Sequence, residues 1–261
     1  VPRLARGALP SRAACITFDD GYADNFEVAL PILKKHGLPA TFFIATGFLE
    51  GGRMWNDTLI EAVRLTSQIE LDLSDARIEG LGRVPVVSTQ QRRSAINLLL
   101  GAIKHLPQQA RLRAVNAVVK SACLRDDALP SSLMMRPFQV RALRQSGMQI
   151  GAHTVNHPIL AILEDEEARA EIQNSRDHLQ EVLDAPVPLF AYPNGRPGED
   201  YTRRDVELVR DLGFRAAVST AWGTSSQQTD CFQIPRFTPW DRTRLKFGLR
   251  LARNTSGPAL T

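Results

Sequence analysis

The sequence predicts an α/β fold built on a parallel sheet that is either open or closed into a barrel. Short apolar runs recur along the chain and alternate with longer segments of helical periodicity. Glycines such as Gly37 and Gly213 end several of the helical segments. Polar motifs directly follow three of the apolar runs, and active sites of such folds lie at the carboxyl ends of the strands. Together these observations favour repeated strand–helix units with one functional face.

Each element of this fold is predicted from its own pattern. An unbroken apolar run such as residues 40–45 is typical of a strand in a parallel sheet. The first run, at residues 13–18, is predicted to be a buried strand, and Cys15 within it is expected to be a small core residue. Helices are predicted where apolar residues recur at helical spacing, at residues 25–36, 138–147, 164–183 and 201–212. Strands are predicted at residues 13–18, 40–45, 148–152, 188–192, 216–219 and 231–234.

The segment from about 51 to 145 has a different character from the rest. Helical patterns dominate it, at residues 55–65, 88–106 and 107–123, with Pro and Gly between them. We interpret it as a helical insertion that caps one end of the sheet. The predicted organisation is therefore a single domain over residues 1–261 with an insertion at about 51–145.

Composition excludes some classes of function. The 261 residues are 43% hydrophobic, enough to bury one substantial core, and the formal net charge is +4. No block of consecutive Lys or Arg residues concentrates that charge, which argues against a nucleic-acid partner. No apolar stretch approaches the length of a transmembrane span. Because the chain starts at Val1, we expect a processed or trimmed start, and the pattern assigns neither an oligomeric state nor a cellular location.

Asp19 and Asp20 form the most informative pair of residues. They follow the first apolar run and precede Gly21, so both carboxylates are predicted at the mouth of a strand. Adjacent carboxylates repel each other and lose hydration there unless a cation compensates them. The alternative is an ordinary turn, because Asp-Asp-Gly is a sequence that favours turns. A turn explains Gly21 but does not explain why two carboxylates follow an apolar strand. We prefer Asp20 as a metal ligand and Asp19 as a base that takes a proton from water.

His153 and His157 follow a second apolar run and are four residues apart. Their even spacing keeps both on one side of an extended chain, and Pro158 biases His157 away from helical angles. Two imidazoles with one carboxylate suit Zn²⁺, with Co²⁺, Ni²⁺ and Fe²⁺ as alternatives. Two solvated loop histidines are the simpler alternative. The Asp pair favours a divalent metal held by Asp20, His153 and His157.

Three motifs now resemble those of the polysaccharide deacetylases, the carbohydrate esterase 4 or NodB homology group. They are Thr-Phe-Asp-Asp-Gly at residues 17–21, His-Thr-Val-Asn-His at 153–157 and Phe-Ala-Tyr-Pro-Asn-Gly at 190–195. The resemblance runs from about residue 13 to residue 237. It implies a distorted (β/α) barrel with fewer than eight units, a Zn²⁺-like metal, and removal of an acetyl group from an N-acetylhexosamine of a polysaccharide or glycan precursor.

The resemblance also implies roles for individual residues. Asp19 matches the catalytic base, and the backbone N–H of Asn194 matches the donor that stabilises the tetrahedral oxyanion. An ordinary strand-to-helix loop is the alternative for this turn. Tyr192 and Pro193 of the third motif are expected to bind substrate. Trp222 follows a predicted strand and is a further candidate for stacking on a sugar, although core packing explains many such tryptophans.

Three departures from the family pattern stand out. Many members carry Arg at the position of Ala191, where it orients the catalytic Asp, and Arg136 and Arg236 are candidates to replace it. The last motif of the family supplies a His as general acid, but residues 234–241 hold none, which leaves a water or Asp241. A first barrel strand carrying a His-Arg pair, found in related members, is also absent from the chain.

Two other functions remain open at this stage. Some relatives hydrolyse small amides or cyclic ureides, and the missing Arg at Ala191 is compatible with such a change of substrate. A glycan-binding protein that keeps the metal but has lost turnover would explain Ala191 together with the missing His.

Overall fold

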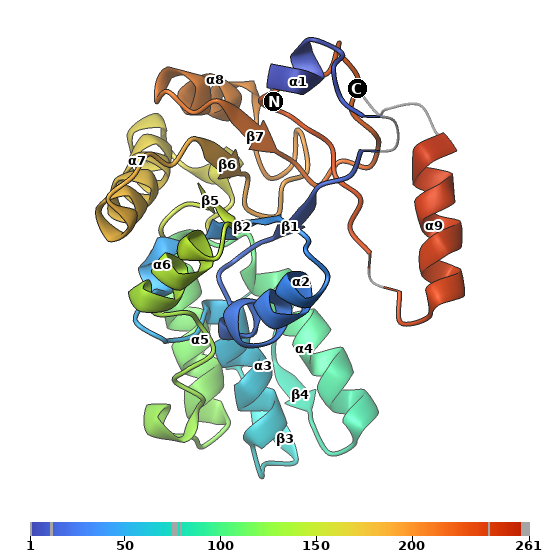
Figure 1. Cartoon of the computed structure of the whole chain (residues 1–261). Coiled ribbons are helices and arrows are strands. Elements are labelled where there is room, and N and C mark those ends of the chain that lie inside the picture. Colours follow the sequence, from blue (N-terminus) through green and yellow to red (C-terminus); the bar gives the residue numbers. More distant parts are fainter. Residues whose placement is uncertain (1, 11–12, 75–77, 79, 240, 257–261) are drawn as a thin grey trace. The chain divides into compact units, whose positions relative to one another are not determined.

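The structure is a computed structural model that describes residues 2–10, 13–74, 78, 80–239 and 241–256 (Figure 1). The chain divides into two compact units. The first unit comprises Val1–Leu49 and Arg136–Thr261, and the second comprises Glu50–Met135. The prediction of a single domain with an insertion at about 51–145 stays a prediction. The compact unit is shorter at its C-terminal end, since the helix that follows Arg136 belongs to the first unit.

A five-stranded parallel sheet forms the centre of the first unit (Figure 1). Its strands lie side by side in chain order. This order is expected when each crossover connection places the next strand parallel to the one before it and next to it. The interior of the sheet is apolar, with Phe42, Ile44 and Phe190 fully buried. The strands are β1 (Ile16–Phe18), β2 (Ala40–Ile44), β5 (Gln149–Ala152), β6 (Leu189–Ala191) and β7 (Ala216–Val218).

The register of the strands aligns the predicted motifs. Phe18 pairs with Phe42, and Ile44 pairs with Ala152, so residues 19–20 and 153 leave the sheet at the same edge. The Asp20 carbonyl accepts from the Ala45 N–H at 3.1 Å, and the Ile44 carbonyl accepts from the His153 N–H at 3.1 Å. Backbone pairing therefore continues one or two residues past the ends of the strands and fixes the start of each motif.

Helices of the first unit connect these strands. α7 packs against α6, α8 and β5. α8 begins with a capping box, in which the Thr202 N–H donates to the Asp205 carboxylate at 2.7 Å. The elements are α1 (Pro2–Ala5), the π-helix η1 (Asn25–Ala29), α2 (Leu30–Lys35), the 3₁₀ turns η2 (Thr46–Phe48) and η5 (Leu160–Ile162), α6 (Pro137–Gln145), α7 (Asp165–Leu183), α8 (Arg203–Asp211) and α9 (Arg244–Ser256).

The second unit has a hydrophobic core of its own. Residues such as Leu59, Leu71, Leu99 and Val118 are fully buried and contribute to one apolar cluster. The Gly52 carbonyl accepts hydrogen bonds from the N–H groups of both Leu133 and Met134, at 3.1 and 3.2 Å. Its elements are α3 (Trp55–Leu65), the antiparallel pair β3 (Glu70–Asp72) and β4 (Arg83–Pro85), α4 (Thr89–Ile103), α5 (Gln108–Ser121) and the turn η4 (Asp126–Ala128).

Three predictions at the level of the fold are wrong. The strand expected at 231–234 is a turn that ends in an isolated β-bridge between Ile234 and Val218 of β7, because the Asp230 carboxylate accepts from the Phe232 N–H at 3.0 Å. Cys15 is exposed, because β1 begins one residue later. β1 is also an edge strand whose residues are half-buried, not a fully buried one. The hairpin of β3 and β4 and helix α9 were not predicted.

Among the helices in the described ranges, none is both long enough and apolar enough to cross a bilayer.

The sheet leaves no room for a side chain at Gly151 of β5. A Cβ there would lie 2.4 Å from the ring of buried Phe43 and 3.0 Å from the Leu189 carbonyl oxygen. We expect Gly151→Ala to lower the free energy of unfolding by about 1–3 kcal/mol, measured by urea denaturation. Gly248→Ala in α9 is the control, because a Cβ there meets nothing within 4 Å. Equal stability of the two variants would contradict this packing.

Candidate metal and catalytic site

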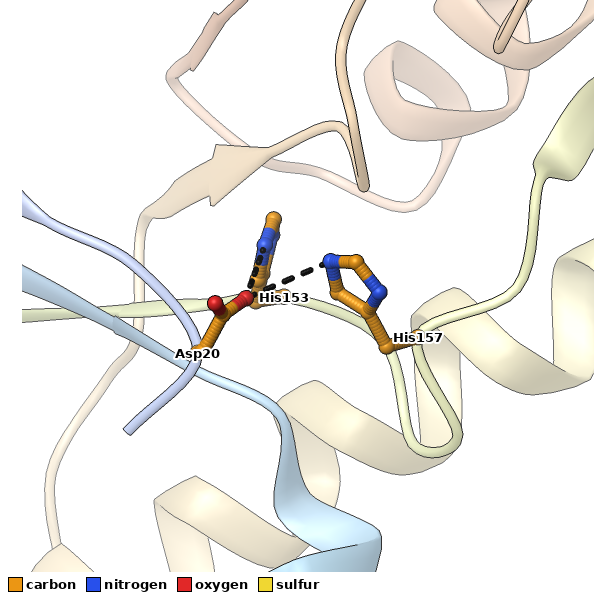
Figure 2. Close-up of side chains that lie close together, drawn as sticks. All are labelled: Asp20, His153 and His157. Atoms are coloured by element: carbon orange, nitrogen blue, oxygen red, sulfur yellow. Dashed lines mark ion pairs between the residues drawn. The ribbon is translucent and has the colours of Figure 1, made fainter. Parts of the chain in front are cut away.

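Asp20, His153 and His157 converge at the carboxyl edge of the sheet (Figure 2). Asp20 follows β1, and the two histidines follow β5. Asp20 Oδ1 lies 3.3 Å from the Nε2 atoms of both His153 and His157. The structure thus brings together the three residues that the sequence predicted as ligands.

The spacing of these three groups fits a bound cation. A direct ion pair between an imidazolium and a carboxylate normally has an N···O distance of about 2.7–2.9 Å. Ligand atoms placed about 2.0–2.1 Å from a tetrahedral Zn²⁺ lie about 3.4 Å from one another. The observed 3.3 Å distances match the second arrangement better. The donor set of two nitrogens and one carboxylate oxygen is therefore suitable for Zn²⁺ and leaves room for further ligands.

The orientation of His153 is set by the neighbouring strand. Its ring is buried, and Nδ1–H donates to the Ala191 carbonyl at 2.7 Å, which leaves Nε2 directed at Asp20. Burial lowers the pKa of His153, but the hydrogen bond to Asp20 and the nearby carboxylates outweigh it and raise that pKa above its usual value. Protons therefore compete with a metal for Nε2, and we expect metal binding to weaken as the pH falls.

Asp20 is ionised under ordinary conditions. Burial raises the pKa of its carboxyl, but the hydrogen bond from His153 and the charges of both histidines lower it to about 2. The carboxylate is thus available as a ligand through the whole range in which the imidazoles are neutral.

Asp19 is held by Arg236, which comes from the far end of the first unit. Arg236 Nη1 and Nη2 donate to the two carboxylate oxygens at 2.8 and 2.7 Å. The same guanidinium donates from Nη1 to Thr17 Oγ1 at 3.1 Å and from Nε to the Ser219 carbonyl at 2.8 Å. Burial raises the pKa of Asp19, but the charge and hydrogen bonds of Arg236 outweigh it, so the pKa is below its usual value.

Arg236 therefore makes the contact to Asp19 for which the sequence offered two candidates, Arg136 and Arg236, in the absence of an arginine at Ala191. The other candidate, Arg136, is the N-cap of α6, where its backbone N–H donates to Gln139 Oε1 at 2.8 Å. The bidentate geometry fixes both the position and the orientation of the Asp19 carboxylate, as a planar guanidinium does.

The turn after β6 presents Asn194 with a left-handed backbone. Its φ is +59°, and the Thr220 hydroxyl donates to its carbonyl at 2.6 Å. Within the described part of the chain, no acceptor is recorded for the Asn194 N–H. That amide is consequently available to a ligand.

Tyr192 and Pro193 are placed differently from the sequence prediction. Tyr192 is fully buried, stacks on Tyr201 at 3.8 Å between ring centroids and donates its hydroxyl to the Phe232 carbonyl at 3.0 Å. Pro193 is buried as well. Their side chains support the turn from inside, so their positions do not present them to a substrate.

Trp222 and Asp241 lie beside helix α9. Trp222 is half-buried, and the guanidinium of Arg250 lies 5.7 Å from the centroid of its ring. Arg250 also pairs with Asp241 at 2.7 Å. Asp241 is thus engaged in an ion pair. The role of Asp241 as a proton donor and the role of Trp222 in binding both stay predictions.

Glu171 of α7 is the residue that sequence reasoning missed. Its buried carboxylate accepts from the N–H groups of Val155 and Asn156 at 2.9 and 2.8 Å, and from Asn156 Nδ2 at 2.7 Å. It therefore ties down the loop between the two histidines. A signal was present, since Glu171 lies at helical spacing among the buried residues of α7 (Ala168, Ile172, Ser175 and Leu179).

The model of a family described as polysaccharide deacetylase matches residues 6–69 and 105–217. The chain belongs to the polysaccharide deacetylase family. The resemblance found in the sequence is thereby confirmed.

Individual members of the polysaccharide deacetylase family are distant relatives. The Bacillus subtilis protein YxkH, assigned by its name to this family, is 20% identical over 234 residues, covering 89% of this chain and 54% of its own length. The poly-β-1,6-N-acetyl-D-glucosamine N-deacetylase of Staphylococcus aureus is 37% identical over 68 residues, 26% of this chain and 23% of its own. The chain thus spans about half or less of these relatives.

A solved structure confirms the fold class. The Streptococcus pyogenes deacetylase PplD, in complex with acetate, superposes with a TM-score of 0.61 at 20% identity, covering 98% of this chain and 76% of that one. The predicted distorted (β/α) barrel of the polysaccharide deacetylase type is confirmed by this likeness.

The Glu171 contacts predict a measurable effect on metal affinity. We expect Glu171→Ala to weaken Zn²⁺ binding by about 10–100-fold, because the loop that carries His157 loses its anchor. Competition with a chromogenic chelator measures the affinity, and hydrogen exchange should show faster exchange at the Val155 and Asn156 amides. Asp205→Ala, which removes a buried carboxylate from α8, is the matched control and should leave both readouts unchanged. Unaltered affinity in Glu171→Ala would contradict the assigned role.

Proposed function

We propose that this protein is a metal-dependent hydrolase that removes acetyl groups from N-acetylhexosamine residues of a polysaccharide or glycan precursor. The observation that carries the proposal is the pairing of two adjacent carboxylates with different partners. Asp20 lies against the two imidazoles, and Asp19 lies against Arg236. Membership of the polysaccharide deacetylase family and the local likeness to the staphylococcal N-deacetylase support the substrate class.

Asp20, His153 and His157 would hold the metal. A bound Zn²⁺ would supply Lewis-acid polarisation of the acetyl carbonyl and lower the pKa of water at the site. Zn²⁺ is favoured by the donor set, with Co²⁺, Ni²⁺ and Fe²⁺ as alternatives. The His153 ring is already fixed for this task, since Nδ1–H is donated to the Ala191 carbonyl.

Asp19 acts as the base in this proposal. Its carboxylate stays ionised beside Arg236 and takes one proton from the water that attacks the acetyl carbon. The hydroxyl adds to the acetyl carbon, and the C–N bond breaks as the nitrogen gains one proton and leaves as an amine. The acetic acid that forms loses its remaining proton to solvent and leaves as acetate. The described residues place no third imidazole in the cluster. In this proposal the proton that Asp19 has accepted passes to the leaving nitrogen, and a water or Asp241 is the alternative donor.

The Asn194 N–H is the proposed backbone donor to the oxyanion. It follows β6 at the carboxyl edge, and the left-handed backbone of Asn194 is part of the turn. A fixed amide aimed at developing negative charge needs little reorganisation during the reaction.

The two other functions raised by the sequence lose their main support. Both drew on the missing arginine at Ala191, and Arg236 supplies that contact. No contact in the described residues favours a small amide over a glycan.

A panel assay tests the proposed activity. We expect acetate release from β-1,6- and β-1,4-linked N-acetylglucosamine oligomers, lost after treatment with a chelator and restored by Zn²⁺ or Co²⁺. Asp19→Asn should lower kcat by about 10²–10⁴-fold while keeping the metal, whereas His153→Ala should lose both. Asp24→Asn, at an exposed carboxylate, is the control. Acetate release that survives Asp19→Asn would sink the mechanism.

Replacing Arg236 should change the pH profile. The guanidinium holds the pKa of Asp19 below its usual value, so its removal raises that pKa and protonates the base at a higher pH. We therefore expect the acid limb of log kcat/KM in Arg236→Met to move to higher pH, and Arg236→Lys to restore part of the charge without the bidentate contact. Arg203→Met, at an exposed arginine of α8, should leave the profile in place. An unmoved acid limb in Arg236→Met would contradict this.

A further inference from the structure

Helix α9 presents an apolar face that is not used to hold it in place. Leu245 and Leu249, four residues apart, are 74% and 64% exposed. Figure 1 shows α9 as a separate red helix at the side of the first unit. Exposed leucines at this spacing lie on one face of a helix.

The opposite side of α9 carries its contacts. Phe247 lies edge-on to Phe237 at 5.8 Å between centroids. Arg250 contacts Trp222 and Asp241, and the Asn254 side chain donates to the Gly223 carbonyl at 3.2 Å. At 3.6 residues per turn, the mean direction of Phe247, Arg250 and Asn254 is roughly 150° from that of Leu245 and Leu249. The leucine pair therefore faces away from the rest of the first unit.

The charge on α9 has a single sign. Residues 242–256 contain five Arg or Lys residues and no Asp or Glu, although the whole chain has 32 basic and 28 acidic residues. Arg250 is neutralised by Asp241. The other four (Arg242, Arg244, Lys246 and Arg253) are exposed. A helix with exposed basic side chains and an exposed leucine pair is complementary to a surface that is both apolar and negatively charged.

We propose that α9 docks on an anionic lipid surface, with Leu245 and Leu249 inserted between the headgroups. A helix with an apolar face and lysines and arginines on its flanks is typical of elements that lie in the membrane interface. The long basic side chains can keep their charges at the headgroups while their stems contact lipid. A second copy of this chain is disfavoured, because two such helices would repel each other.

An acidic protein would have to offer a groove for the leucines, whereas a lipid surface receives a convex helix without one. The proposal concerns a surface only, and it is independent of the deacetylase function. The contact does bear on the site, because Phe237, on which α9 packs, directly follows Arg236. A lipid-bound α9 would hold the edge of the catalytic face near the membrane.

Co-sedimentation with vesicles tests the proposal. We expect the chain to bind mixed vesicles that contain equal parts of phosphatidylglycerol and phosphatidylcholine. Binding to vesicles of pure phosphatidylcholine should be far weaker. The double variant Leu245→Ser/Leu249→Ser should reduce the partition coefficient by about tenfold or more. Lys246→Gln and Arg253→Gln should each reduce it by about fivefold, and binding by the wild type should weaken as salt is added.

Val28→Ser/Ile32→Ser is the matched control. These residues form another exposed aliphatic pair at the same spacing, 57% and 54% exposed, but with acidic Asp24 and Glu27 beside them. Circular dichroism verifies that each variant is folded. Equal vesicle binding by the wild type and the leucine variant would overturn the proposal. So would equal binding to neutral vesicles, or a dimer, seen by ultracentrifugation, that the leucine variant abolishes.

Discussion

The contact between Arg236 and Asp19 is the interaction on which the site depends. The guanidinium reaches Asp19 and Thr17 at one edge of the sheet and the Ser219 carbonyl just past β7 at the other. One side chain thereby joins the two edge strands of an incomplete barrel. It also solves the electrostatic problem of two neighbouring carboxylates, because Asp19 receives a permanent cation of the chain and Asp20 is left for titratable imidazoles. The different partners give the two carboxylates different proposed roles, with Asp19 as the base and Asp20 as the metal ligand.

Backbone strain is concentrated where the chemistry lies. Of the six non-glycine residues with positive φ in the described chain, four are in the motifs, and they are Asp20, Thr154, His157 and Asn194. Each such residue costs about 1–2 kcal/mol. Hydrogen bonds hold these segments: the Glu171 carboxylate accepts from two N–H groups of the histidine loop, and the Thr220 hydroxyl donates to the Asn194 carbonyl. The stability of neighbouring helices and strands thus maintains a site that local preference alone would relax.

Local patterns foretold the sheet, most helices and the three converging ligands, because apolar periodicity and strand ends are properties of short segments. What they missed depends on the tertiary structure. Arg236 was one of two candidates until the fold brought it to a residue 217 positions away. Glu171 was hidden within a charged helix, although it occupies the buried side. Tyr192 was expected to contact substrate because it stands in a motif, yet its ring is fully buried and stacks on Tyr201.

The double hydrogen bond at Gly52 gives the second unit a particular kind of independence. Because Leu133 and Met134 both donate to its carbonyl, the chain leaves this unit beside the point at which it entered. The segment between is a closed loop, and the entropy of closing such a loop grows only with the logarithm of its length. The length and sequence of this segment can consequently change while β2 and β5 keep their register. A protein engineer could treat it as a replaceable cassette.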